Sequence, residues 1–534
     1  MAFAIAFLQA FFAYFLRLVI YDDAYITYRY ARNWADGLGP VFNAGDRVEG
    51  CTTFLQMAVL VPFEWLNVDP RFASLVISIA ALALVSTWSA VWIARRTPEA
   101  DAAGVWPRFA FWLTLTNPAL MYWTISGMET MWFVAAIFAA TMTAAWEMEG
   151  DRVPWRSGLL AAIAALIRPD GAVVVVALAV AWSWLVPNRR PRAFVIAALG
   201  VAAIGALTAW RLSYYGDPVP NTFYAKVGAS NFHHWLRGLW YVVRAVFSAV
   251  IPVPLIWLAW RRSKVGARWS RFEKLLLVVI VGQVAQTIWT GGDYMGFYRF
   301  LAPVWPLALM LLWSLATTPH AQGVRTPSSY WRLQVPARKW VVLVAGLQIL
   351  NIFIDMNGLK VMIGQGLTRQ WEAQARVMRR IIPTGTLVAD TAIGASGYLT
   401  NLPMIDMMGL TDRTIARTKM PMGRRYPGHE KFNSTYVLSR KPAFILICTK
   451  LSPAPMPKCP YDEDGFASMP ARTDMMKTSD FQRDYVYANY AARDTYIGIY
   501  MRRELLGTSG FENWFVADPH DPAGSPPPSQ PVAK

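Results

Sequence analysis

A bundle of membrane-spanning helices followed by a soluble α/β domain is the fold that this sequence predicts, so the chain is expected to be mostly α. Three observations predict it. The chain of 534 residues is 55% hydrophobic with a mean hydropathy of +0.28, which is too apolar for an ordinary soluble protein. Apolar segments long enough to cross a hydrocarbon core recur down to about residue 355. After Phe353 the charge rises and the apolar runs shorten.

The first part of the chain contains roughly eleven predicted spans. They cover residues 2–20, 72–94, 109–122, 131–146, 158–167, 171–186, 193–212, 242–260, 275–290, 301–316 and 340–353. Residues 52–65 are also apolar, but we assign them to a juxtamembrane helix, because an additional span there would put the downstream charge pattern out of phase.

With that assignment, every second loop carries a basic cluster. The clusters are Arg95 and Arg96, Arg152 and Arg156, Arg189 to Arg192, 261–274 and 325–339. The positive-inside rule makes these loops cytoplasmic, so the alternate loops and everything after Phe353 face outward. The formal charge of +17 follows mainly from this topology. Nucleic-acid binding is disfavoured, because the basic residues lie at span ends rather than on one face of a domain.

The sequence divides into a membrane domain over 1–358, a soluble α/β domain over 359–517 and a disordered tail over 518–534, which is rich in Pro, Gly and Ser. Residues 386–390, 443–448 and 496–501 are predicted strands, and 370–380 is a predicted connecting helix. Cys448 and Cys459 lie in a region assigned to an oxidising compartment, which favours a disulfide.

The residues with the clearest chemical potential are Asp22 and Asp23, directly after the first span. Adjacent carboxylates raise each other's pKa, which suits one of them to deprotonate a hydroxyl at the membrane surface. The neighbour would then bind a cation or orient a sugar. The alternative is structural, because aspartate is a favoured N-cap residue.

Other outward loops also carry polar groups near the bilayer, and ionisable groups at membrane depth indicate function by default. Arg168, Lys226 and Arg299 are candidates to stabilise negative charge on a departing phosphate. The candidate substrate-binding residues are Glu49, Glu129, Asp170, Asn221, Tyr224, Asp293 and Tyr294. Each alone also fits a structural role, and the tyrosines also fit an interfacial aromatic belt.

Together these groups supply what sugar transfer from a lipid phosphate needs, namely a carboxylate base and cations for the leaving group. A base on the side of the sugar opposite to the phosphate favours single displacement with inversion. The sequence leaves open whether a divalent cation takes part, because the acids could hold one while the basic residues could neutralise phosphate alone.

An acidic pair after the first span, a juxtamembrane helix and alternating short loops resemble the GT-C superfamily of polyprenyl-phosphate-sugar glycosyltransferases. Several motifs in order are similar to the mycobacterial terminal arabinofuranosyltransferases. They are Asp22-Asp23 with Arg32-Asn33, Gly39-Pro40-Val41-Phe42-Asn43, Gly45-Asp46-Arg47-Val48-Glu49, Pro220-Asn221-Thr222 with Ala225-Lys226, and Gly291-Gly292-Asp293-Tyr294-Met295. Ile405-Asp406, Gly409-Leu410-Thr411-Asp412 and Ala416-Arg417 extend the similarity into the second domain. Cys51 replaces the residue that is more usual in that family before Thr52.

The resemblance implies a multi-pass protein of the bacterial inner membrane, whose active site and C-terminal domain face the periplasm. It also implies a polyprenyl-phosphate sugar donor, inverting transfer, and Asp22 or Asp23 as the base. The acceptor would be a glycan, lipid or protein, with the C-terminal domain helping to hold it; arabinofuranose is one candidate sugar. The competing hypotheses are a transporter or flippase of a lipid-linked saccharide, and a glycan-binding scaffold without chemistry.

Overall fold

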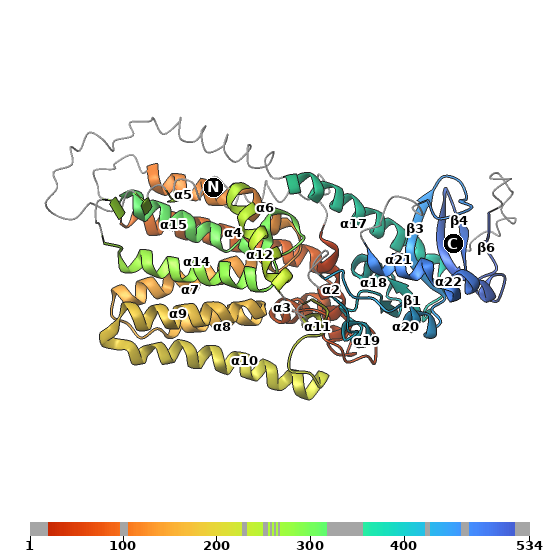
Figure 1. The fold of residues 1–534 in the computed structure, drawn as a ribbon, viewed down its shortest axis with the longest axis horizontal. Coiled ribbons are helices and arrows are strands. Elements are labelled where there is room, and N and C mark those ends of the chain that lie inside the picture. The colour runs from red at the N-terminus through yellow and green to blue at the C-terminus, as the bar shows by residue number, and fades with distance from the viewer. Residues whose placement is uncertain are drawn as a thin grey trace.

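The computed structural model describes residues 20–96, 105–226, 232–248, 255–256, 259–260, 263–264, 268–317, 356–421, 428–460 and 469–517. Apart from Ile20, the predicted spans 2–20 and 340–353 lie outside these residues, as does the predicted tail 518–534. A helical bundle occupies one end of the molecule and a sheet-containing domain the other (Figure 1).

Most helices of the bundle run along the long axis of the molecule (Figure 1). The helices of the bundle are α4 (Pro70–Ala94), α5 (Val105–Leu115), α6 (Pro118–Ile125), α7 (Thr130–Glu149), α8 (Trp155–Ile167), α9 (Ala172–Leu185), α10 (Ala193–Tyr215), α12 (Phe232–Ser248), α14 (Arg271–Trp289) and α15 (Val304–Thr317). The 3-10 turns η1 (Pro169–Gly171), η2 (Pro187–Arg192) and η3 (Gly296–Leu301) lie between them. At the end nearest the sheet, α2 (Asp22–Ala35), α3 (Phe54–Trp65) and α11 (Asn221–Lys226) complete this part.

Four helical segments in the described part are long and apolar enough to cross a membrane, which supports a membrane protein. They are Pro70–Ala94, Thr130–Glu149, Pro187–Tyr215 and Arg271–Trp289. The predicted number of about eleven spans is not confirmed, because other predicted spans form apolar helices of only 10–17 residues. Within residues 52–65, assigned to a juxtamembrane helix, the short helix α3 covers Phe54–Trp65.

The predicted span over 109–122 is divided between two helices. Helix α5 ends at Leu115, and α6 begins at Pro118 with Asn117 as its N-cap, whose side chain accepts a hydrogen bond from the Leu120 amide at 3.1 Å. Proline has no amide hydrogen and is favoured at the first position of a new helix, so this Asn-Pro pair starts α6 rather than continuing α5.

The bundle is built around α7. In the most apolar 18-residue stretch of this helix, 89% is buried inside the protein, whereas the corresponding share in the segment that contains α10 is 22%. Figure 1 agrees, since α10 lies along one edge of the bundle. Small residues let neighbouring backbones approach closely: a Cβ on Gly158 of α8 would lie 3.1 Å from the Ile196 Cα of α10.

The C-terminal part is mixed α/β. It begins with α17 (Met356–Ile381) and continues with β1 (Val388–Asp390), α18 (Ile393–Thr400), β2 (Met404–Asp406), α19 (Arg413–Ala416), α20 (Ser434–Ser439), β3 (Phe444–Ser452), α21 (Pro470–Lys477), α22 (Ser479–Asp484), β4 (Tyr485–Ala492), β5 (Thr495–Arg502), η4 (Arg503–Leu505) and β6 (Trp514–Phe515). The three predicted strands correspond to β1, β3 and β5, and the predicted connecting helix is part of the longer α17.

The strands of the described residues form one mixed sheet in the order β2-β1-β3-β5-β4-β6. Strands β2, β1 and β3 are parallel, whereas β3, β5, β4 and β6 pair antiparallel. Cys448 and Cys459, whose bonding the sequence left open, form a disulfide that ties the middle of β3 to the loop that follows.

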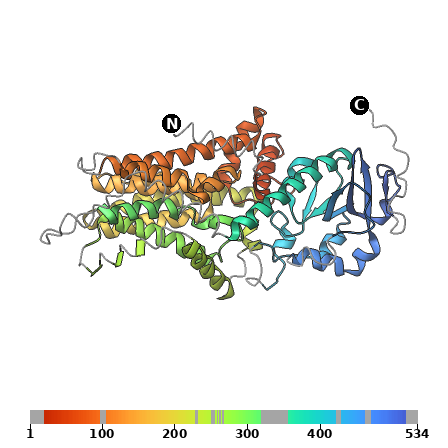
Figure 2. The ribbon, with the colours of Figure 1, turned by 90° about the horizontal axis from the view of Figure 1, so that it is seen from above.

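Helix α2 joins the two parts of the molecule. Figure 2 shows it between the bundle and the C-terminal domain, running across the long axis. Its buried Arg29 donates to the carbonyls of Phe42, Gly397 and Leu402 at 2.7–2.9 Å, so one guanidinium satisfies backbone groups from both parts. An interface held in this way places the start of α2, with its two carboxylates, at the junction.

Candidate active site at the domain junction

Asp22 is held by the C-terminal domain. Its carboxylate accepts the amide hydrogens of Ala395 at 2.8 Å and Gly394 at 3.2 Å, at the N-terminus of α18. A Cβ on Gly394 would lie 2.0 Å from the Asp22 carbonyl oxygen, so glycine permits this approach. Burial raises the pKa of Asp22 to about 7, although the hydrogen bonds from the two backbone amides favour the charged carboxylate. Asp22 therefore fixes the position of α2 against α18.

Asp23 has a different environment. It is half-buried and has no hydrogen-bond partner among the described residues. Its charge acts on Tyr21, Tyr294 and Arg299, so all three lie within electrostatic range of it. The pKa of the Tyr294 hydroxyl is well above its usual value, because of burial and then the Asp23 charge. Asp23 is therefore a carboxylate with free acceptor capacity beside a charged, partly aromatic cluster.

Two arginines form buried ion pairs in this cluster. Arg168, at the end of α8, lies 3.1 Å from Glu129 and 2.9 Å from Asp170. Arg299 lies 2.7 Å from Asp293, and the two guanidinium groups are close enough to influence each other's charge. Because carboxylates already neutralise both arginines, a phosphate would have to displace or share these partners to bind them.

The loop that carries Glu129 is anchored at Gly127. The Gly127 carbonyl accepts three side-chain hydrogen bonds, from Tyr28 at 2.8 Å, Gln56 at 3.0 Å and Ser74 at 2.9 Å. Gly127 has a φ of +78°, a conformation that glycine adopts without a steric penalty. These contacts from α2, α3 and α4 hold the loop in place two residues before Glu129.

The loop that carries Arg299 is strained. Phe297 and Tyr298 both have positive φ, at 52° and 48°, and together they form the kinked part of η3 immediately before Arg299. Bulky side chains in this region cost about 1–3 kcal/mol each and persist where the surroundings impose them, often at functional sites. Asp293 steadies the other end of the loop by accepting the Tyr294 amide at 2.8 Å.

Two of the predicted substrate-binding residues have structural partners instead. The Glu49 carboxylate accepts two hydrogen bonds from the Arg211 guanidinium of α10, at 2.7 and 2.9 Å, and both side chains are buried. Asn221 donates to three carbonyls of one loop in the C-terminal domain, those of Gly409, Leu410 and Asp412.

The remaining predicted residues lie along α11. The Tyr224 ring lies 4.7 Å from the Arg417 guanidinium. Lys226 packs beside Gly428, and within the described residues its ammonium forms no ion pair. Lys226 is therefore a cation that an incoming phosphate would not have to release from a carboxylate.

The segment that begins at Gly428 was not predicted as part of the site. The His429 ring lies 4.6 Å from the Tyr294 ring in an edge-on contact. The next residue, Glu430, lies 3.7 Å from Arg237 of α12, which itself donates to the Gly291 carbonyl at 3.0 Å. A lone histidine in a glycine-containing loop gave no signal in the sequence, so only the fold reveals its place beside Tyr294.

The described residues contain no group of three or more His, Cys, Asp or Glu side chains arranged to hold a metal ion. The four acids of the cluster, Asp23, Glu129, Asp170 and Asp293, are instead distributed around the two arginines. The described part of the arrangement offers a carboxylate without a hydrogen-bond partner at Asp23, buried cations with acidic partners, and tyrosines close to them.

Comparison with known proteins gives one family match and two relatives. A domain of unknown function, DUF8728, matches residues 363–505. A protein of Mycobacterium tuberculosis named terminal beta-(1->2)-arabinofuranosyltransferase is 27% identical over 259 residues, which cover 44% of this chain and 39% of the relative. A protein of the same name from Corynebacterium glutamicum is 24% identical over 407 residues, covering 68% of this chain and 54% of the relative. The chain therefore matches only 39% and 54% of the lengths of these relatives. No solved structure matches.

Proposed function

We propose that this protein is a membrane glycosyltransferase that moves a sugar from a polyprenyl-phosphate donor to a hydroxyl of a glycan, lipid or protein acceptor. The reaction takes place where the start of α2 meets the C-terminal domain. The single observation that carries the proposal is Asp23, a half-buried carboxylate without a hydrogen-bond partner among the described residues, facing Arg299 and Tyr294.

Asp23 acts as the general base and removes the proton of the acceptor hydroxyl as its oxygen attacks the anomeric carbon. The bond from that carbon to the phosphate oxygen breaks in the same displacement, so the anomeric configuration inverts. Asp22 is the positioning residue, since both its oxygens are already occupied by the amides of α18.

Lys226 and Arg299 supply positive charge to the departing phosphate, and Arg168 supports them through the shared network. Lys226 can do so directly because it has no ion-pair partner in the described part of the chain. Arg299 would exchange part of its contact with Asp293 for the phosphate, a change that Asp293 tolerates because it also accepts the Tyr294 amide.

Arabinofuranose is the proposed sugar, because both relatives are named for its transfer. The proposed site faces the periplasm, because the basic loops at the far end of the bundle are predicted to be cytoplasmic. The C-terminal domain is proposed to help hold the acceptor, since it contributes His429 next to Tyr294.

The test is transfer of radiolabelled sugar from a panel of polyprenyl-phosphate donors by the purified full chain, with and without EDTA. Asp23→Asn is the inactive variant, and Asp36→Asn is the matched control, an exposed aspartate at the other end of α2. Wild-type and Asp36→Asn transfer that is lost in Asp23→Asn would support the proposal. Failure of wild type with every donor, together with uptake of a lipid-linked saccharide into vesicles, would favour a transporter.

A further inference from the structure

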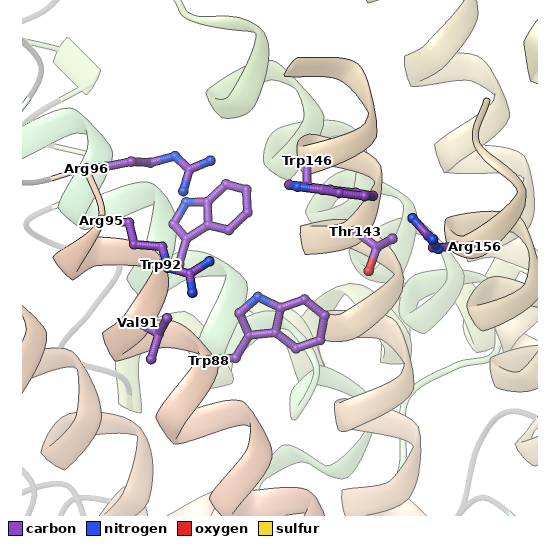
Figure 3. Close-up of a pocket in the computed structure, with 8 residues that line it drawn as sticks. All are labelled: Trp88, Val91, Trp92, Arg95, Arg96, Thr143, Trp146 and Arg156. Carbon is purple, nitrogen blue, oxygen red and sulfur yellow. The ribbon is translucent and has the colours of Figure 1, made fainter. Parts of the chain in front are cut away.

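A second polar site lies at the end of the bundle far from Asp23. It is a cavity of about 710 Å³ between the last turns of α4 and α7 and the first turn of α8. Figure 3 shows its lining, in which three tryptophans and three arginines surround one space: Trp88, Trp92, Trp146, Arg95, Arg96 and Arg156. The 20 residues of α7 rise about 30 Å, so the cavity and Glu129 lie near opposite ends of one helix.

The cavity is positively charged. Arg96 pairs with Glu149, but Arg95 and Arg156 form no ion pair with any described residue. Glu147, a buried acid of α7, accepts the backbone amides of Arg156 and Ser157, and its charge interacts with the Arg156 guanidinium without an ion pair between them. As far as the described residues go, the two exposed guanidinium groups of Arg95 and Arg156 are therefore available to an anion.

The tryptophans give the cavity aromatic walls. The Arg96 guanidinium lies 3.5 Å from the Trp92 ring centre and that of Arg156 lies 5.3 Å from Trp146, so aromatic faces hold the cations over the cavity. Tryptophan at the end of an apolar helix is typical of the membrane interface, where one side of the ring is apolar and the other wet. Both α4 and α7 are long and apolar enough to cross a membrane.

We infer that this cavity binds the phosphate head group of an anionic phospholipid, in the leaflet away from the proposed active site. Guanidinium groups recognise phosphate oxygens, and basic pockets between helices at the inner face of a membrane bind such head groups. The volume lies within the range of small-molecule sites and exceeds what a free phosphate fills. The aromatic walls fit the glycerol and upper acyl carbons of a lipid. This inference stands independently of the proposed transferase activity.

The experiment is native mass spectrometry of the detergent-purified full chain, titrated with phosphatidylglycerol, with phosphatidylcholine and with glycerol 3-phosphate. The variants are Arg95→Gln, Arg156→Gln and Arg156→Lys. Arg190→Gln is the matched control, because it removes one exposed arginine from the same end of the bundle but outside the cavity. Thermal midpoints of all variants identify any that fail to fold.

The expected result is preferential binding of phosphatidylglycerol that weakens about fivefold for each glutamine substitution in the cavity. Arg156→Lys should retain more of the binding than Arg156→Gln, and Arg190→Gln should bind like wild type. The inference is overturned if Arg190→Gln weakens binding as much as Arg156→Gln, or if folded Arg95→Gln and Arg156→Gln bind like wild type. Equal binding of glycerol 3-phosphate would also overturn it, because the ligand would then be a soluble phosphate.

Discussion

Asp22 and Asp23 are neighbours in the chain but point into different surroundings, because successive residues of a helix are turned about 100° from each other. Asp22 faces the N-terminus of α18, where the partial positive charge of the helix end and two amides receive its carboxylate. Asp23 faces the Arg299 cluster. The division of roles proposed for the pair follows from this geometry.

The buried ion pair between Glu49 and Arg211 should contribute to stability. Glu49→Gln leaves the buried Arg211 guanidinium without its charged partner, so the free energy of unfolding should fall by about 3 kcal/mol. Thermal melts of the purified protein measure the change. Asp151→Asn is the control, because its pairs with Arg189 and Arg192 are exposed and should contribute less than about 1 kcal/mol. An unchanged midpoint with weaker acceptor binding would instead favour the substrate-binding role predicted from the sequence.

How far these roles could be predicted depends on where each partner lies in the chain. Alternating spans bring the loops of Glu129, Arg168 and Asp293 to one end of the bundle, so the charge pattern sufficed to predict that they share a face. The partner of Asp22 lies in α18, which no local pattern connects to α2. Arg211 lies inside an apolar run, so its bond to Glu49 also left no signal.

At the scale of elements, long apolar runs were the most predictable feature. Residues 72–94 and 131–146 correspond to α4 and α7, because an uninterrupted apolar run of this length has few alternatives to a helix. Ends and breaks were less predictable. The division of 109–122 depended on whether Asn117 would cap a new helix, a choice that hydropathy does not report.

The loop that carries Glu129 depends on the absence of a side chain at Gly127. In Gly127→Ala the new Cβ would lie 2.4 Å from the Tyr28 hydroxyl oxygen, so the loop that carries Glu129 must move. Displacements of about 1 Å can reduce activity about 100-fold, and we expect a loss of that order in kcat/KM for sugar transfer.

Gly37→Ala is the control for that substitution. Gly37 has a similar φ of +80°, but a Cβ added to it would have no atom within 4 Å, so this variant reports the backbone cost alone. That cost is about 1 kcal/mol of stability, with little change in kcat/KM. Equal kinetics in the two variants would show that the Gly127 contacts do not position the site.

At the scale of the whole molecule, buried carboxyls at the junction predict a pH dependence of stability. Burial raises the pKa of Asp390 to about 7 and that of Asp406 to about 6, as it does for Asp22. Between about pH 4 and pH 7 the folded state therefore holds protons that the unfolded chain has released. The contribution of these carboxyls to the free energy of unfolding is therefore greatest near about pH 4 and decreases as the pH rises to about 7.

Asp390→Asn tests this pH dependence, because asparagine can keep the contacts to the Ala392 amide and the Ser396 hydroxyl without a titrating group. The stability of this variant should fall less than that of wild type as the pH rises. At pH 7.5 the variant should therefore melt at a higher temperature than wild type. Thermal midpoints measured from pH 5 to pH 8 provide the check. Identical pH profiles for the two proteins would contradict the assignment.

The whole-molecule arrangement was predicted in outline. A change of composition near residue 355 indicated a second domain, and three of its six described strands, β1, β3 and β5, were predicted from short apolar runs. How that domain docks depends on single contacts such as Arg29 with the carbonyls of Gly397 and Leu402, which join segments far apart in the chain. Such contacts carry no periodic signal, so the junction could be located only in the folded structure.

In the proposed mechanism, Asp23 removes the acceptor proton while Asp22 holds the C-terminal domain in place through the amides of Gly394 and Ala395. The most direct test measures sugar transfer and the thermal midpoint on the same preparations of wild type, Asp22→Asn and Asp23→Asn. We predict that Asp23→Asn reduces transfer about 100- to 10,000-fold with an unchanged midpoint, whereas Asp22→Asn lowers the midpoint. Near-normal transfer by Asp23→Asn, with transfer lost in an equally stable Asp22→Asn, would contradict the claim and assign the base to Asp22.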